Sequence, residues 1–281
     1  MTSIRNIIFT SLSFLFTISV LTSCDFVKED ERYILGPEVK AERAVLLEDF
    51  TGQYCVNCPE AHEVIKQLET QFGKDKVIAV SIHCGDFGIP VSVTNFSTGA
   101  VGLMTEEGNA IMSAYGINSF PMGVIDNGNP EIYDLWPTSV RNELQKPSHV
   151  DIDLHAKFEP DESKTEGITG TIKITANVLS GEDSDANIQF WITEDEIVSF
   201  QKTLDSTIYD YVHDNVFRAQ VFPGVNGQSI KLQARETMKF TGSIVSKWTD
   251  KERWEVKNLS VVAFVSDKSG VLQAKRVKVE S

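Results

Sequence analysis

Two cysteines stand close enough in the sequence to act as one chemical group. The chain has four cysteines, and Cys55 and Cys58 form a Cys-x-x-Cys pair that Pro59 follows directly. The pair lies between an apolar run at 44–50, typical of a buried strand, and a helical pattern at 61–72. At a helix N-terminus, free backbone N–H groups and the helix dipole favour the thiolate over the thiol. Because the thiolate is the nucleophile of disulfide exchange, the pair predicts a thiol–disulfide oxidoreductase.

The Cys-x-x-Cys pair has two other interpretations. One is half of a zinc site, which His62, His83 and Cys84 would complete. The strand–motif–helix context and the lack of a second Cys-x-x-Cys argue against zinc, so we expect neither a metal nor a cofactor. The other is a permanently oxidised, structural disulfide that tightens the start of the helix. This second alternative stays open.

Cys84 ends another apolar run, at 76–84, which is rich in β-branched residues and predicts a strand. A lone thiol in that position is usually a small apolar side chain packed in the core, a buried filler, and we rank this interpretation first. A resolving or regulatory thiol ranks second, because the parallel strands of a βαβ unit end at the same sheet edge, near Cys55.

The elements around the cysteines follow the order β-α-β-α-β-β-α. A long loop comes after the second strand, followed by a helix near 103–115, a hairpin at 122–130 and a helix near 139–145. This order resembles the thioredoxin fold, and Asp49–Cys55 matches without a gap that family's stretch from its buried acid to its nucleophilic cysteine. The resemblance implies that Cys55 attacks, Cys58 resolves and Asp49 assists proton transfer at Cys58.

A second segment extends the resemblance to thioredoxin-like proteins. Asn118–Pro121 is similar to the segment that carries the family's cis-proline, which implies that Pro121 packs beside the disulfide and shapes the substrate groove. Two positions depart from the family pattern: Tyr54 stands where Trp is usual, and Val56-Asn57 replaces the common Gly-Pro. Because the dipeptide between the cysteines tunes the reduction potential, the direction of the redox reaction stays open.

The first 23 residues have the features of a signal peptide. Arg5 precedes an apolar run at 7–21 that is too short and too rich in Ser and Thr for a membrane span. The run ends in Leu-Thr-Ser-Cys, which resembles the lipobox of bacterial lipoproteins, so we expect Cys24 to be acylated and to become the first mature residue. An acidic tether at 24–39 would follow. The alternative is an ordinary signal peptide with a chance cysteine.

The charge of the chain excludes one class of partner. Its 281 residues carry a formal net charge of −14, and the sequence pI is about 4.8. Proteins that bind phosphate backbones need clustered Lys and Arg to displace counterions. The sequence has no such cluster, so we expect no nucleic-acid partner.

The second half of the chain alternates apolar and polar residues with a period of two. The alternation is clear at 150–158 and 168–178 and recurs at 188–192 and 230–234, and apolar runs near 261–265 and 274–279 complete the set. Seven or eight short strands of this kind indicate an immunoglobulin-like β-sandwich. The predicted fold class is therefore a thioredoxin-like α/β domain at 40–147 followed by an all-β sandwich domain at 148–281.

The chain as a whole resembles the twenty-eight-kilodalton outer-membrane protein family of Gram-negative lipoproteins. The resemblance rests on the Cys-x-x-Cys-Pro motif and on the stretches 191–195, 213–218 and 258–265. It implies an outer-membrane lipoprotein that joins a thioredoxin-like half to a β-rich half. Members of the family are suspected surface adhesins or receptors. The membrane face, periplasmic or surface, stays open.

Two functions are consistent with these features. The first is thiol–disulfide exchange with the thiols or disulfides of exported proteins, carried by Cys55 and Cys58. The second is a surface adhesin or receptor in which the disulfide is structural and the β-sandwich binds an extracellular ligand. In both, lipid on Cys24 anchors the protein to the membrane.

Overall fold

The computed structural model describes residues 39–163 and 169–281. Residues Pro37–Ser281 form one compact unit. The predicted signal peptide, the lipidated Cys24 and all but the last residue of the acidic tether lie outside the described residues. Within the described parts of the chain, no helix is both long and apolar enough to cross a membrane.

Strands and helices alternate in the first part of the described chain. The elements are β1 (Val45–Thr51), α2 (Cys58–Phe72), β2 (Val77–His83), α3 (Glu106–Ala114), β3 (Met122–Ile125) and α4 (Trp136–Leu144). The long predicted loop after β2 contains three short 3-10 helices, η2 (Gly85–Phe87), η3 (Val91–Val93) and η4 (Phe96–Thr98). The predicted first helix and first two strands are confirmed to within a few residues.

The remaining described elements are strands, apart from one 3-10 turn. They are β4 (Val150–Pro160), β5 (Gly170–Ser180), β6 (Ser184–Glu194), β7 (Ile197–Lys202), β8 (Thr207–His213), β9 (Val216–Gln220), β10 (Gln228–Leu232), β11 (Thr237–Val245), η5 (Val256–Asn258), β12 (Leu259–Asp267) and β13 (Gly270–Lys278). The six alternating or apolar runs noted in the sequence correspond to β4, β5, β6, β10, β12 and β13. The sequence did not predict β7, β8, β9 or β11.

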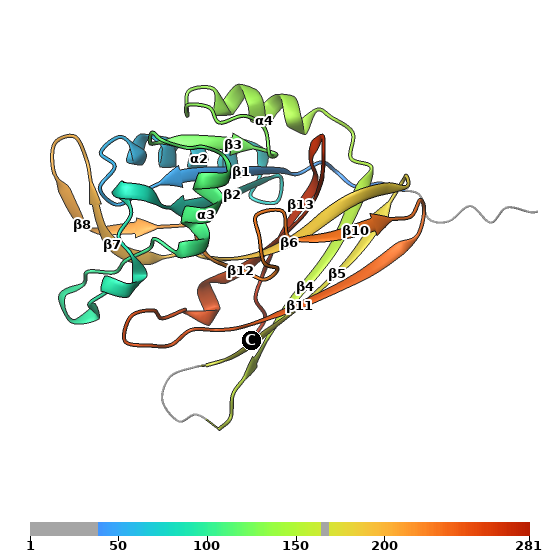
Figure 1. Cartoon of the computed structure of the whole chain (residues 1–281). Coiled ribbons are helices and arrows are strands. Elements are labelled where there is room, and N and C mark those ends of the chain that lie inside the picture. The colour runs from blue at the N-terminus through green and yellow to red at the C-terminus, as the bar shows by residue number, and fades with distance from the viewer. Residues whose placement is uncertain (1–38, 164–168) are drawn as a thin grey trace, which may run out of the picture. The chain divides into compact units, whose positions relative to one another are not determined.

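The predicted fold class is wrong, because the described chain is mostly β and its first three strands belong to a larger sheet. An eight-stranded sheet has the order β13-β12-β6-β9-β2-β1-β3, with β10 also paired to β6 (Figure 1). The edge of β2 is occupied by β9, where the backbone N–H of Ser81 donates to the carbonyl of Asn215 at 2.8 Å. No separate thioredoxin-like α/β domain forms, since strands from the second half continue the sheet.

The two faces of β1 and β2 are covered by different parts of the chain. Every residue of both strands is buried, as expected for strands covered on both faces. Apolar residues of α2 and α4, including Ile65 and Trp136, pack on one face. Ile111 of α3 packs on the other, together with Trp191 and Phe217 from the second half. The core beside α3 is therefore built jointly by both halves of the chain.

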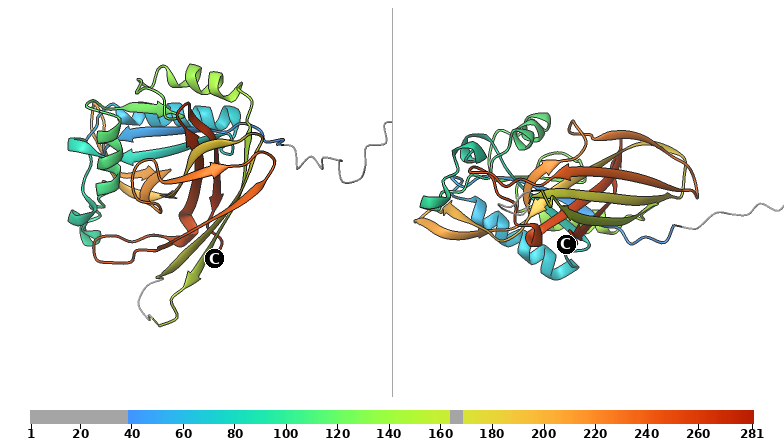
Figure 2. Two further views of the ribbon diagram at one scale, coloured as in Figure 1. Left: turned by 45° about the vertical axis from the view of Figure 1, so that its right-hand side comes forward. Right: turned by 90° about the horizontal axis from the view of Figure 1, so that it is seen from below.

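A second, three-stranded sheet with the order β11-β5-β4 packs against β6, β12 and β13 (Figure 2). β4 alternates buried and exposed residues along nearly its whole length, so one face lies on the core and the other faces water. The layered β-structure expected for the second half is therefore present. It shares its larger sheet with β1, β2 and β3.

One buried acid in this core predicts a pH-dependent stability. Glu48 of β1 is buried, and burial, opposed by a hydrogen bond with Tyr115 and reinforced by Asp126, raises its pKa from 4.5 to about 8. Between pH 4.5 and about pH 8, Glu48 keeps its proton in the folded protein and loses it in the unfolded chain. Glu48 therefore makes the fold less stable as pH rises. Glu48→Gln removes the effect and keeps a polar side chain of similar size.

We expect urea unfolding to show that Glu48→Gln gains stability relative to the wild type between pH 5 and pH 8, by at most about 1.4 kcal/mol for each pH unit. The difference between the two proteins cancels the titration of groups that do not interact with Glu48. A difference that stays constant or shrinks as pH rises would contradict the prediction.

Candidate functional site

The Cys55–Cys58 disulfide lies at the start of α2. The two Cα atoms are 5.4 Å apart, Cys58 is the first residue of the helix and Pro59 occupies its first turn. No side chain caps this helix N-terminus, so the dipole acts directly on the pair. Tyr54 and Val56 on either side of Cys55 are exposed, whereas the cysteines themselves are only 3% and 0% exposed.

The hairpin β7–β8 covers the cysteine loop. Gln201 of β7 donates from Nε2 to the carbonyl of Cys55 at 2.9 Å and to that of Gly52 at 3.2 Å. The backbone N–H of Lys202 donates to the carbonyl of Gln53 at 2.8 Å, and the ring of Phe200 contacts Tyr54 with centroids 5.2 Å apart. These contacts hold a segment from the second half against the disulfide.

Asp49 lies on β1 and is fully buried, and neither of its carboxylate oxygens has a hydrogen-bond partner. Nε2 of His62 lies 3.5 Å from Oδ2 of Asp49. His62 follows Cys58 by one helical turn, so it projects from the same side of α2. The predicted role of Asp49 in proton transfer stays a prediction.

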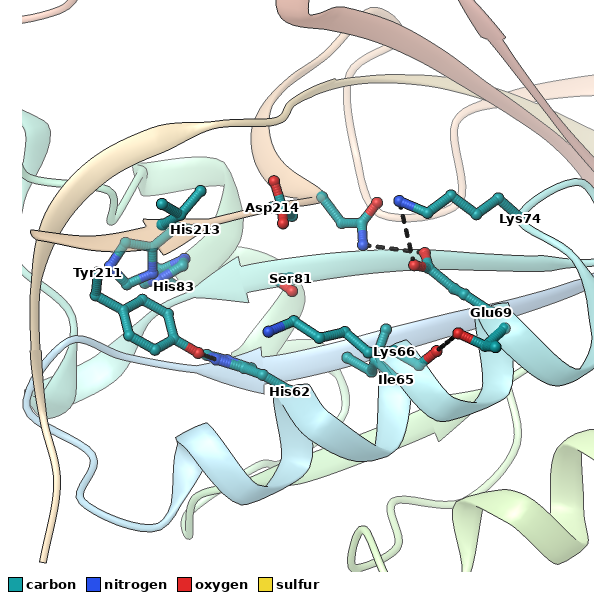
Figure 3. A pocket seen from close by; sticks show the side chains of 13 residues that line it. His62, Ile65, Lys66, Glu69, Lys74, Ser81, His83, Tyr211, His213 and Asp214 are labelled. Atoms are coloured by element: carbon teal, nitrogen blue, oxygen red, sulfur yellow. Dashed lines mark hydrogen bonds and ion pairs between the residues drawn. The ribbon is translucent and has the colours of Figure 1, made fainter.

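Three histidines gather beside a pocket of about 410 Å³ between α2, β2 and the turn after β8 (Figure 3). The rings of His83 and His213 stack edge to face with centroids 5.1 Å apart. Burial, reinforced by His62, lowers the pKa of His213 to about 3, and burial also holds the pKa of His83 well below its ordinary value. Both rings are therefore neutral at physiological pH.

The zinc alternative has no geometric support. No group of three His, Cys, Asp or Glu side chains in residues 39–163 and 169–281 is arranged to hold a metal ion. Cys84 is a free, buried thiol that donates to the carbonyl of Ile82 at 3.3 Å. Burial and nearby Asp49 raise its pKa, which disfavours a reactive thiolate. The structure thus favours the first interpretation of Cys84, a buried filler.

Pro121 lies just before β3 and is buried. The Phe120–Pro121 peptide bond is cis, which is the geometry that the resemblance implied. The ring of Phe120 packs against Phe87 with centroids 5.3 Å apart, and the carbonyl of Phe87 accepts from the backbone N–H of Tyr54 at 2.9 Å. Phe120, the neighbour of Pro121, thus reaches the cysteine loop through Phe87. The role of Pro121 in substrate binding stays a prediction.

Two contributors to the site were not assigned a redox role from the sequence. His62 was considered only as a metal ligand, although its position four residues after Cys58 was a usable signal. Gln201 gave no local signal, because β7 lacks the apolar alternation that marks a strand.

Comparisons with known proteins identify the family. The family described as Outer membrane protein Omp28 matches residues 108–281. No curated protein sequence matches the chain significantly. The solved structure of HBP35 of Porphyromonas gingivalis is similar, with 16% identity and a TM-score of 0.62 over 87% of this chain and 76% of that one, which shows a shared fold alone.

A crystal structure of a domain of the outer membrane lipoprotein Omp28 from Porphyromonas gingivalis also aligns. It has 18% identity and a TM-score of 0.32, and it covers 48% of this chain and 91% of that one. The family match includes all three second-half stretches on which the resemblance rested, while Cys55 and Cys58 precede it. The chain belongs to the Omp28 family of outer membrane proteins.

Proposed function

We propose that this protein is an outer-membrane lipoprotein that exchanges disulfides with exported proteins. Family membership supports the outer-membrane location, and the sequence Leu-Thr-Ser-Cys at 21–24 supports a lipid anchor on Cys24. The observation that carries the exchange is the Cys55–Cys58 disulfide at the uncapped N-terminus of α2. The helix dipole stabilises a thiolate formed there, which lowers the barrier to breaking and re-forming the disulfide bond.

The atoms and electrons of the exchange balance with the substrate and the cysteine pair alone. A thiolate of an exported dithiol attacks Sγ of Cys55, the bond to Cys58 breaks, and Cys58 leaves as a thiolate that takes up a proton. A second substrate thiolate attacks the mixed disulfide and releases Cys55. Two electrons pass from the substrate to the protein, and the reverse sequence reduces a substrate disulfide. Asp49 supplies or accepts the proton at Cys58, and Pro121 borders the substrate.

A surface receptor with a structural disulfide is the second candidate, and two observations favour it. Both cysteines are buried, and the hairpin β7–β8 is bonded to the carbonyl of Cys55, so a substrate reaches Cys55 only when this region shifts. The same hairpin exposes several apolar side chains, which is typical of a binding surface. These residues are Val198, Leu204, Ile208, Tyr209 and Val212.

A redox titration of the mature, folded protein against glutathione separates the two candidates. Thiols are trapped with a maleimide reagent at each potential and counted by mass, while circular dichroism reports the fold. Exchange predicts a reversible two-electron transition between about −270 and −120 mV with the fold intact.

A pair that is reduced only when the protein unfolds, or that resists reduction below about −300 mV, would refute the exchange function and favour the receptor. Cys84→Ser is the matched control, because a buried free thiol contributes nothing to the transition. The titration curve of this variant should superimpose on that of the wild type.

A further inference from the structure

A buried carboxylate without hydrogen bonds needs a compensating neighbour. Asp49 has no exposed surface and no hydrogen bond to either oxygen, an arrangement that is unfavourable for an ionised group. His62 Nε2, at 3.5 Å, is a neighbouring group able to pass it a proton. Asp49 has no exposed surface, whereas the His62 side chain beside it is 11% exposed.

His62 connects Asp49 to a residue from the other half of the chain. Its Nε2 also lies 3.0 Å from Oγ1 of Thr51, and its Nδ1 lies 2.8 Å from the hydroxyl of Tyr211 on β8 (Figure 3). Tyr211 is partly exposed and lines the pocket that opens beside α2. A 3.5 Å contact and a 2.8 Å hydrogen bond thus lead from Asp49 through His62 to Tyr211 and the pocket.

We infer that His62 and Tyr211 form a proton path between Asp49 and solvent, and that this path serves the thiol–disulfide exchange proposed above, on which the inference rests. When Cys58 leaves as a thiolate, Asp49 gives it a proton. His62 then releases the proton on Nε2 to Asp49 and takes one on Nδ1 from Tyr211, which recovers its proton from water. The imidazole thereby changes tautomer, and no net charge remains in the core.

The groups around the path favour proton transfer in which His62 and Tyr211 are neutral before and after each step. The titratable and charged groups around His62 and Tyr211 are Asp49 on β1, His83 on β2, Glu63 and Lys66 on α2, and His213 and Asp214 at the end of β8. Burial raises the pKa of Tyr211, with Glu63, Asp49 and Asp214 adding to the rise, so the phenol keeps its proton between transfers. A neutral phenol beside an imidazole is able both to donate and to accept.

The test compares Tyr211→Phe with Tyr209→Phe. Both variants lose one hydroxyl from β8, but Tyr209 is 79% exposed and has no place in the path. The measured quantity is the rate at which dithiothreitol reduces the Cys55–Cys58 disulfide of the mature protein from pH 6 to 9, with maleimide trapping. We expect Tyr211→Phe to be slower by about tenfold at pH 7, with a changed pH profile, and Tyr209→Phe to match the wild type.

A reduction rate that does not fall in Tyr211→Phe would identify the Tyr211 hydroxyl as a purely structural contact. If the Tyr211 hydroxyl only holds the hairpin over the disulfide, its loss frees the hairpin and the rate rises or stays the same, which would overturn the path. His62→Gln is the second variant, and it should show the same slowing as Tyr211→Phe. A wild-type disulfide that dithiothreitol reduces only on unfolding would instead refute the exchange function, and the path with it.

Discussion

Cys58→Ser should trap exported proteins in mixed disulfides at Cys55. In the wild type, Cys58 attacks the mixed disulfide and releases the substrate, and serine is unable to do so. The Cys55 thiolate of the variant attacks a substrate disulfide, forms one new S–S bond and expels one substrate thiolate, and the reaction stops there. Non-reducing gels of whole cells should show new bands containing the variant, all of which disappear on reduction, and turnover of disulfide substrates should be lost.

Cys55→Ser is the matched control for this trap. Both variants lose the same disulfide, whose very short loop is worth about 2 kcal/mol, so they are destabilised alike. Cys58 has no exposed surface, in contrast to Cys55 with its exposed neighbours Tyr54 and Val56, and should capture few or no partners. Equal adducts from both variants would show non-specific thiol chemistry, and no adducts from either would favour the structural disulfide.

The local elements around the cysteines could be predicted, because short-range patterns specify them. The apolar run of β1 and the helical spacing of Ala61, Ile65 and Leu68 appear directly in the sequence, and all of these residues are buried. The Cys-x-x-Cys position at the helix start follows from the order of these two elements. A disulfide between neighbours three residues apart requires no knowledge of the rest of the fold.

The fold class could not be predicted, because it depends on pairing between distant strands. β9 has five residues, and its link to β2 joins Ser81 to Val216, a contact without any local signature. The core beside α3 is completed by Trp191 and Phe217 from the second half. The local β-α-β-α-β order therefore suggests a self-contained domain. In the structure, the strands of this segment are part of a larger sheet.

The candidate site was predicted only as far as its residues come from one segment. Asp49, Cys55 and His62 lie within fourteen positions, and the order strand–helix places Asp49 and His62 3.5 Å apart. Tyr211 and Gln201 reach the site on β7–β8, whose apolar residues do not alternate regularly with polar ones and whose burial pattern in β8 shows little alternation. Strands that are held mainly by hydrogen bonds to another element show little hydrophobic periodicity in their sequence.

Arg218→Met should be among the most destabilising single changes in this protein. Arg218 on β9 is buried between two buried acids, with Nε 3.3 Å from Glu194 and Nη2 3.5 Å from Glu252. Methionine fills much of the same space but leaves Glu194 without its cation and Glu252 with Lys247 alone, at 3.0 Å. Removing one partner of a buried ion pair costs about 3–5 kcal/mol. Urea unfolding at pH 8 should show a decrease of this size, since Glu194, whose pKa is about 7 in the intact protein, is ionised there for the most part.

The pH dependence of this loss distinguishes electrostatics from packing. Burial already raises the pKa of Glu194 to about 7 although Arg218 opposes the rise, and removing Arg218 raises it further. The variant should therefore recover stability relative to the wild type as pH falls from 8 to 5, because protonation discharges the buried acid in the folded state. Adding Glu194→Gln to Arg218→Met should restore part of the loss at pH 8.

Lys231→Met is the matched control, since it breaks the ion pair with Asp185 in which both side chains are 85% exposed. Water screens such a pair, so this variant should unfold like the wild type. A loss in Arg218→Met that is equally large at pH 5 and pH 8 would mean that the Arg218 side chain acts through its packing. A loss that shrinks with falling pH would establish that Arg218 balances the charge of the buried Glu194 on β6.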